Sequence, residues 1–386
     1  MGKRFLIGQL GCFGDCLYAT TIAHQIKNDF HDSHITWAVG SKYKSILINN
    51  PDVDLIWEIS STYGNYSNIG WEKFEKEALT RRNKGDFDEI IFSQISPRNW
   101  IKFTGTIRGT ILRAYPRPIT VSVSPIVCLS NEEITRVKQF AHVHVFKRYN
   151  NIILFECAPG SGQSKIDVNF AIEVAKRVIA SNSDVCFVIS TPKKIDVDDE
   201  QIIDASELTY IENAELTKYC TLLVGCSSGI TWLSTSNWAK KIPMLQLLSD
   251  NSIFTGVHYD FALNGLDNRH IIEMIKFDSD IVIKCIRSIL DKGVEATKST
   301  YHQNYKPSLN NFEYIIGLQV YYRESIFKII KSTRLFLRRT EELGNIIKVN
   351  YFSYLKRLIY LKISMSENSL ILCLRKQRDR LKREKF

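Results

Sequence analysis

This chain of 386 residues lacks several features that would have decided its class at once. It has no run of 18 or more apolar residues, so we expect no transmembrane helix. No signal-peptide pattern precedes the first predicted strand, so we expect a cytoplasmic protein. The sequence also shows no internal repeat, and its 44% of hydrophobic residues is ordinary for a globular protein.

Paired cysteines and metal-like histidine spacings are missing too. The nine cysteines form no C-x-x-C pair, and most lie in apolar runs. This pattern is typical of buried thiols in a reducing compartment rather than of disulfides or a zinc site. Among the eight histidines, His142 and His144 could share a strand face, but a third ligand is not in view. We therefore expect neither a metal nor another cofactor.

The net charge of +10 comes from one end of the chain. Residues 323–386 hold 17 basic and 6 acidic side chains, whereas the other 322 residues hold 34 and 35. The basic excess therefore describes a terminal segment and says nothing about the chemistry of the remaining chain.

The length favours two domains, each large enough to bury a core. We place them at residues 1–148 and 149–293, followed by a linker at 294–312 and a tail at 313–386. In the first domain, apolar runs predict strands at residues 3–8, 35–40, 55–59, 87–92 and 119–123. A helix should follow the glycine-rich turn at 8–15, because apolar residues then recur with helical spacing.

The second block repeats the alternation of strand and helix. Strands are predicted at residues 152–157, 185–190, 201–204, 222–225 and 243–248. Helices are predicted at 211–220, 230–238 and 280–290, and a further one should bury Ala171, Val174, Ala175 and Val178. The fold class expected is therefore α/β, with two doubly wound domains facing a cleft.

The tail at 313–386 interleaves apolar and basic residues, which predicts amphipathic basic helices. One interpretation is contact with the anionic inner face of a membrane. The other is packing on the two domains or on a second subunit. A nucleic-acid partner is not expected, because the charge of the tail is its only support and no recognition motif is present.

Asp15 is the first candidate for chemistry, since it follows a strand at the edge where parallel sheets bind ligands. It could simply cap the helix, worth about 1 kcal/mol. It could instead be a general base that takes the proton of a sugar hydroxyl. Both roles are compatible only if one carboxylate oxygen stays free.

Two small-residue loops follow strands of the second block. Residues 160–165 could bind an anion through backbone amides, with Lys165 neutralising a diphosphate. Residues 225–231 could add amides and the hydroxyls of Ser227, Ser228 and Thr231. The alternatives are a solvated lysine and a tight strand-to-helix connection. Neither loop matches G-x-x-x-x-G-K-[ST] or G-x-G-x-x-G.

Taken together, these motifs resemble glycosyltransferase family 9, the bacterial heptosyltransferases. Residues 14–23 (GDCLYATTIA) resemble its G-D-x-[LV]-x-x-[TL]-P-A turn, and residues 50–54 (NPDVD) its N-P-x-V-D segment. Residues 87–94 (FDEIIFSQ) are similar to its Y-D-x-[VL]-[IV]-D-[LF]-Q strand, and 224–233 (VGCSSGITWL) to its V-G-x-D-[ST]-G-x-x-H-L motif. The similarity covers roughly residues 1–293.

The resemblance implies a GT-B fold and inverting, metal-independent transfer from a nucleotide sugar, usually ADP-heptose, to a glycan or lipid-linked glycan acceptor. It makes Asp15 the catalytic base and Lys165 the diphosphate ligand. The donor and phosphate set it implies is Ser161, Gly162, Ser164, Lys165, Ser227, Ser228, Gly229, Ile230 and Thr231. The acceptor side is Phe13, Gly14 and Gln94.

The chain departs from the family pattern at three positions. Ser227 replaces an Asp, Trp232 replaces a His, and Thr21 replaces the helix proline. The first two changes keep open a different donor sugar. They also keep open a second class of function, a non-catalytic protein that binds nucleotides or glycans with a GT-B shell.

Overall fold

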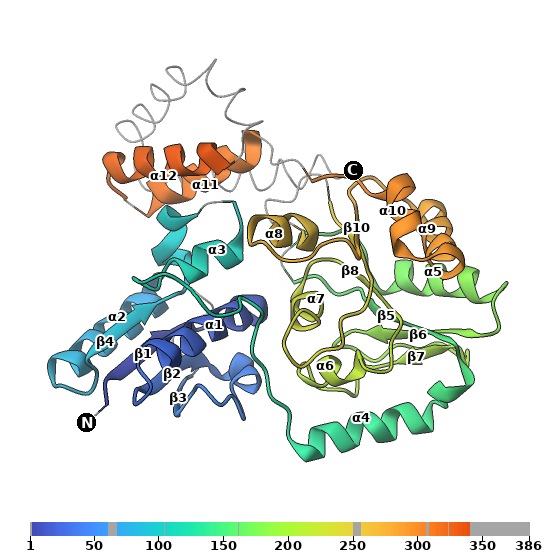
Figure 1. Ribbon diagram of the computed structural model, residues 1–386, viewed down its shortest axis with the longest axis horizontal. Coiled ribbons are helices and arrows are strands. Elements are labelled where there is room, and N and C mark those ends of the chain that lie inside the picture. Colours follow the sequence, from blue (N-terminus) through green and yellow to red (C-terminus); the bar gives the residue numbers. More distant parts are fainter. Residues whose placement is uncertain are drawn as a thin grey trace.

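The computed structural model describes residues 2–60, 68–103, 105–160, 162–249, 256–305, 309–322 and 324–339. Two parallel sheets with flanking helices lie beside each other (Figure 1). The predicted α/β architecture is therefore confirmed. Within the ranges just given, none of the helices has the length and apolarity needed to span a bilayer.

The first sheet has the strand order β3-β2-β1-β4, and all of its pairs are parallel. Its elements are β1 (Arg4–Gly8), α1 (Phe13–Asp29), β2 (His34–Gly40), β3 (Leu55–Ile59), α2 (Asn68–Asn83) and β4 (Glu89–Phe92). Strand β1 is apolar on both faces, and Phe5, Leu6 and Ile7 are fully buried. Such a strand suits an interior position, and its carboxyl end leads directly into α1.

The strand predicted at residues 119–123 is wrong, because this segment runs along α1 instead of joining the sheet. The backbone N–H groups of Thr120 and Val121 donate to the side-chain oxygen of Gln25, at 2.7 and 3.0 Å. A helix side chain thus satisfies donors that a sheet ladder would otherwise have used. Helix α3 (Ile107–Leu112) precedes the segment, and α4 (Asn131–Val143) follows it.

The second sheet has the order β10-β9-β8-β5-β6-β7, again with parallel pairs throughout. Its strands are β5 (Asn151–Glu156), β6 (Val185–Ser190), β7 (Ile202–Asp204), β8 (Leu222–Gly225), β9 (Met244–Leu247) and β10 (Ile271–Met274). Its helices are α5 (Val168–Ile179), α6 (Glu212–Leu216), α7 (Gly229–Leu233), α8 (Val257–Leu263) and α9 (Ser279–Lys292). The predicted face of α5 is confirmed, since its four apolar residues are buried.

Residues 294–305 of the segment predicted as a linker are structured. Residues 294–301 form α10 (Val294–Tyr301), and the chain then runs beside the edge strand β10. The N–H of Gln303 donates to the carbonyl of Glu273 at 2.7 Å, and the N–H of Glu273 donates to His302 Nδ1 at 3.0 Å. The linker residues therefore cover a strand edge that would otherwise be open.

The described part of the tail consists of α11 (Leu309–Tyr321) and α12 (Ile326–Arg339), which return to the first domain beside α3 (Figure 1). Gln319 Nε2 donates to the carbonyl of Trp100 at 2.9 Å, and the hydroxyls of Tyr322 and Ser96 are 2.7 Å apart. The rest of the tail, residues 340–386, for which amphipathic helices were also predicted, lies outside the described residues.

Candidate functional site at the domain interface

Asp15 is the third residue of α1, so it is not the N-cap, which is Cys12. Its carboxylate accepts a hydrogen bond from the backbone N–H of Cys12 and thus still serves the helix end. Burial raises the pKa of Asp15 to about 7, although part of the side chain remains exposed. A partly accessible carboxyl with this pKa has the properties of a general base near neutral pH.

Gln94 holds the turn that precedes Asp15. Its side-chain oxygen accepts from the backbone N–H groups of Leu10 and Gly11, at 3.0 and 3.3 Å, and from Gln9 Nε2 at 3.0 Å. The residue is buried. Its side-chain oxygen therefore fixes the β1–α1 turn next to the predicted acceptor side.

The start of α1 packs directly on the second domain. The ring of Phe13 stacks on Tyr210 with centroids 4.0 Å apart, and Tyr18 meets Trp232 edge-on at 5.2 Å. A Cβ added to Gly14 would lie 3.3 Å from Cδ1 of Trp232. Trp232 thus joins the two domains next to Asp15.

The loop before α5 carries the predicted phosphate lysine. Lys165 and Gly162 are exposed, whereas Ser164 is buried and its hydroxyl accepts from the N–H of Ile166 at 3.4 Å. Ser161 lies outside the described residues. The N-terminus of α5 is already capped by Asp167, whose side chain accepts from Phe170 N–H. The charge of Lys165, rather than the end of this helix, is what the loop offers to an anion.

The N-terminus of α7 is filled by a carboxylate of the chain itself. Glu156, the last residue of β5, is 3% exposed. Its Oε1 accepts from Ile230 N–H at 2.8 Å, and its Oε2 accepts from the N–H and hydroxyl of Thr231 at 3.2 and 2.5 Å. The backbone N–H groups of Ile230 and Thr231, which were predicted to hold the donor phosphate, therefore already donate to a carboxylate of the chain.

The remaining residues of this loop divide into buried and accessible groups. Ser227 is buried, and both its N–H and its hydroxyl donate to Oε1 of Gln246, at 2.8 and 3.1 Å. The carbonyl of Gly229 accepts from the hydroxyl of Tyr210 at 2.7 Å. Ser228 is partly exposed. Of the serines predicted here, Ser228 is the one placed to meet a ligand.

Gln163 brings the two loops together, since its Nε2 donates to the carbonyl of Ser227 at 3.0 Å. Its backbone carbonyl accepts from Ser249 N–H at 2.9 Å. The loops after β5, β8 and β9 therefore form one connected edge of the second sheet, and Lys165 lies two residues from this junction.

A buried row of polar residues, not predicted from the sequence, anchors this edge. Glu156, Gln246 and Glu273 each lie at or near the end of a strand. Glu273 on β10 lies opposite Gln246 on β9. Gln246 lies opposite Gly225 on β8, and Gly225 directly precedes Cys226. Glu273 accepts from the N–H of His258 at the start of α8 at 2.7 Å, and burial raises its pKa to about 8. The sequence signal that could have identified these glutamates is a charged residue at or near the end of an apolar strand.

Arg108 and Asp260 form a second unpredicted feature, a buried ion pair between the domains. Arg108 Nε lies 2.7 Å from Oδ2 of Asp260, and the two side chains are 1% and 2% exposed. The guanidinium also lies 4.6 Å from the ring centroid of Tyr18 and 5.9 Å from that of Trp232. Helix α3 is thereby tied to α8 (Figure 1).

The Glu156 network makes a stability prediction. Glu156→Gln replaces one acceptor oxygen by an amide that faces backbone donors, so it should lower the free energy of unfolding by about 1–3 kcal/mol. Denaturant unfolding measures the effect. Glu173→Gln, an exposed change on α5, is the control and should cost less than about 0.5 kcal/mol. Equal losses in both variants would contradict the assigned network.

Solved structures show which fold these domains share. The chain is similar to a glycosyltransferase family 9 protein from Veillonella parvula, with 17% identity, a TM-score of 0.54, and coverage of 87% of this chain and 98% of that one. It is also similar to the E. coli ADP-heptose LPS heptosyltransferase II, with 15% identity, a TM-score of 0.51, and coverage of 75% and 98%. No protein-family model and no curated protein matches the chain. The likeness shows that the chain has the GT-B fold, with two parallel sheets and flanking helices.

Proposed function

We propose that the chain is a glycosyltransferase that moves a sugar from a nucleotide-sugar donor to a hydroxyl of a glycan acceptor. The observation that carries the proposal is the place of Asp15. It combines a pKa of about 7 with partial exposure at the carboxyl end of β1, next to the contact with α7. The GT-B fold supports the same class of reaction.

In the proposed step, Asp15 accepts the proton of the acceptor hydroxyl while that oxygen bonds to the anomeric carbon of the donor. The bond from this carbon to the diphosphate oxygen breaks, and its electron pair leaves with the nucleoside diphosphate. Attack opposite the leaving group inverts the configuration at carbon. Lys165 stabilises the charge that develops on the diphosphate, and no metal ion takes part.

The occupied start of α7 changes the proposed donor site. Because Glu156 accepts the hydrogen bonds of Ile230 and Thr231, the diphosphate rests on Lys165 and the exposed loop around Gly162. Ser228 adds a hydroxyl at the same edge. A buried carboxylate behind this loop also disfavours a second negative charge close to α7.

The donor and the acceptor are proposals drawn from the resemblance. ADP-heptose is the first donor to test, because the similar E. coli protein is named for it. The acceptor proposed is a cell-surface glycan of the lipopolysaccharide type, glycosylated in the cytoplasm. Ser227 in place of Asp and Trp232 in place of His make other nucleotide sugars equally necessary in the panel.

A non-catalytic nucleotide- or glycan-binding protein is the second candidate function. The buried Ser227 and the self-filled start of α7 favour it, since both reduce the donor contacts available to the chain. Release of nucleoside diphosphate that depends on acceptor would exclude this candidate. Binding without any such release, across all donors, would support it.

The donor site is tested with a panel of nucleotide sugars in thermal shift and turnover assays. A cognate donor should raise the melting temperature because it binds the native state. Lys165→Met should weaken nucleotide binding by roughly 10–100-fold, as expected for loss of a charge-assisted hydrogen bond. Lys176→Met, an exposed change on α5, is the matched control. Unchanged affinity in Lys165→Met would refute the phosphate assignment.

A further inference from the structure

Helix α12 has one face covered by the first domain. Ile329, Ser332 and Thr333 on it are buried, and Oγ of Ser332 accepts from Gln319 Nε2 of α11 at 3.2 Å. Ile329 belongs to the same hydrophobic cluster as Trp100. One face of α12 therefore packs on a domain, as the second interpretation of the tail predicts.

The other face of α12 is basic, apolar and uncovered. Phe327 is 81% exposed, the largest fraction among the exposed large hydrophobic side chains in the described ranges, and Leu335 is 39% exposed. Lys331 and Arg334 are exposed between them. Positions 327, 331, 334 and 335 follow helical spacing, so they share one side of the helix. We call these four residues the α12 face.

Charge on this face is of one sign. Among the described residues, the ion pair of α12 joins Lys328 to Glu324 at 3.7 Å, and Lys328 is not part of the α12 face. The sequence from residue 323 to the end of the chain carries the net +11 described above. An exposed aromatic ring set among cations, followed by further cations, is the pattern of helices that lie in the interface of an anionic bilayer.

We propose that the α12 face docks on the surface of an anionic lipid bilayer. Phe327 and Leu335 enter the boundary between headgroups and acyl chains, while Lys331 and Arg334 bind lipid phosphates. Because α11 and α12 pack on the domain that carries Asp15, docking places this domain next to lipid-linked molecules. The proposal does not depend on the catalytic assignment.

The full chain is tested by co-sedimentation with vesicles of phosphatidylglycerol and of phosphatidylcholine. Binding is expected to the first alone. Lys331→Glu/Arg334→Glu should reduce it at least about tenfold, since each basic residue near the surface adds to the attraction. Phe327→Ser should remove the binding that persists at high salt. Catalytic turnover on a soluble acceptor should stay unchanged.

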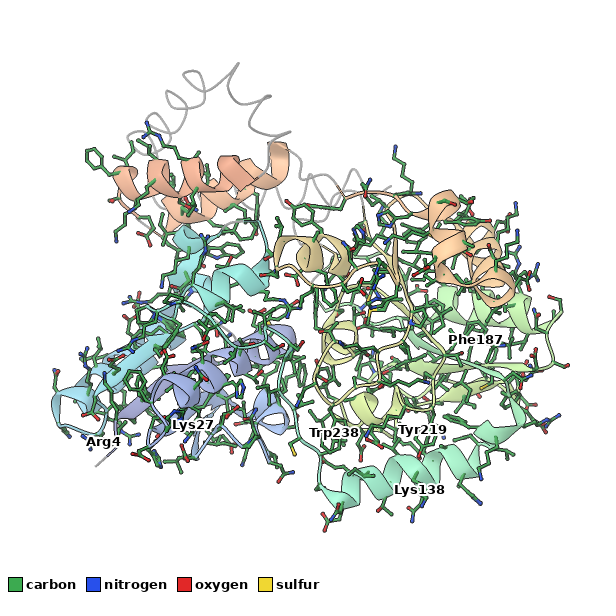
Figure 2. The ribbon with its side chains drawn as sticks, viewed as in Figure 1. Arg4, Lys27, Lys138, Phe187, Tyr219 and Trp238 are labelled. Carbon is green, nitrogen blue, oxygen red and sulfur yellow. The ribbon has the colours of Figure 1, made fainter. Side chains whose placement is uncertain are left out.

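Matched controls use the opposite side of the molecule. Figure 2 shows Lys138 on α4, far from α12. Lys138→Glu/Lys147→Glu makes the same change in charge, and Val143→Ser removes another exposed apolar side chain, 71% exposed. Equal losses in these controls would overturn the proposal, as would equal binding to both lipids. Two further outcomes would also overturn the proposal. If the α12 variants change a dimer into a monomer, the face binds a second copy of the chain. If they lose binding to duplex DNA and not to vesicles, the face binds nucleic acid.

Discussion

Asp15→Asn is expected to lower the turnover number by roughly 10²–10⁴-fold, the range typical for loss of a positioned general base. Asparagine keeps the shape and can still accept the hydrogen bond from the backbone N–H of Cys12, but it cannot accept the proton. Nucleotide binding, measured by calorimetry, should therefore stay within about twofold of wild type. Asp32→Asn, an exposed change just beyond α1, is the control and should have full activity. Full activity of Asp15→Asn would refute the base assignment.

The raised pKa of Asp15 gives the same variant two pH signatures. The base must be ionised, so the wild-type kcat/KM should rise with pH through a pKa of about 7. Folding raises the pKa of this carboxyl from its ordinary value of 3.8 to about 7. The free energy of unfolding of the protein therefore falls as the pH rises from about 4 to 7. Asp15→Asn should therefore be more stable than wild type at pH 8, on the order of 2 kcal/mol after allowance for solvent, and equal at pH 4. A misfolded variant would instead be less stable at both values.

Arg108→Met should be the most destabilising substitution at the domain interface. It leaves Asp260 buried without its cation, and breaking a buried ion pair in this way costs about 3–5 kcal/mol. The pair joins α3 to α8, so its loss should also separate the unfolding of the two domains. Differential scanning calorimetry should show one transition in the wild type and two in the variant.

The double variant Arg108→Met/Asp260→Leu tests whether the cost comes from the unpaired charge. Apolar replacement of both partners is often close to neutral, so the double variant should recover most of the stability lost by the single one. Arg148→Met removes an exposed ion pair with Glu200 and should cost less than about 1 kcal/mol. A double variant as unstable as the single would show that packing, rather than charge, carries the interface.

The regular core of this fold was predictable because its signals are local. Strands β3, β6 and β8 follow the apolar runs to the residue, and α5 buries its predicted face. The segment at 119–123 has the same apolar character, yet its donors bond Gln25, about 95 residues away. A partner so distant in the sequence cannot be inferred from the residues that neighbour the segment.

The candidate site shows the same division. Asp15 and Lys165 stand out because their motifs are contiguous, whereas Glu156 is separated by 74 residues from the helix that it fills. The pair of Arg108 and Asp260 spans 152 residues. Sequence motifs therefore identified Asp15 and Lys165, while the buried partners that position or block the predicted site depend on contacts between distant elements.

Gly14 gives the contact between α1 and α7 a consequence for catalytic geometry. At this position the two domains meet with only a hydrogen atom between backbone and indole, since even a methyl carbon would lie 3.3 Å from Trp232. The next residue is Asp15. Because Gly14 has no side chain, the start of α1 can approach Trp232 this closely. This close approach sets the distance between the Asp15 carboxylate and any group that the second domain binds.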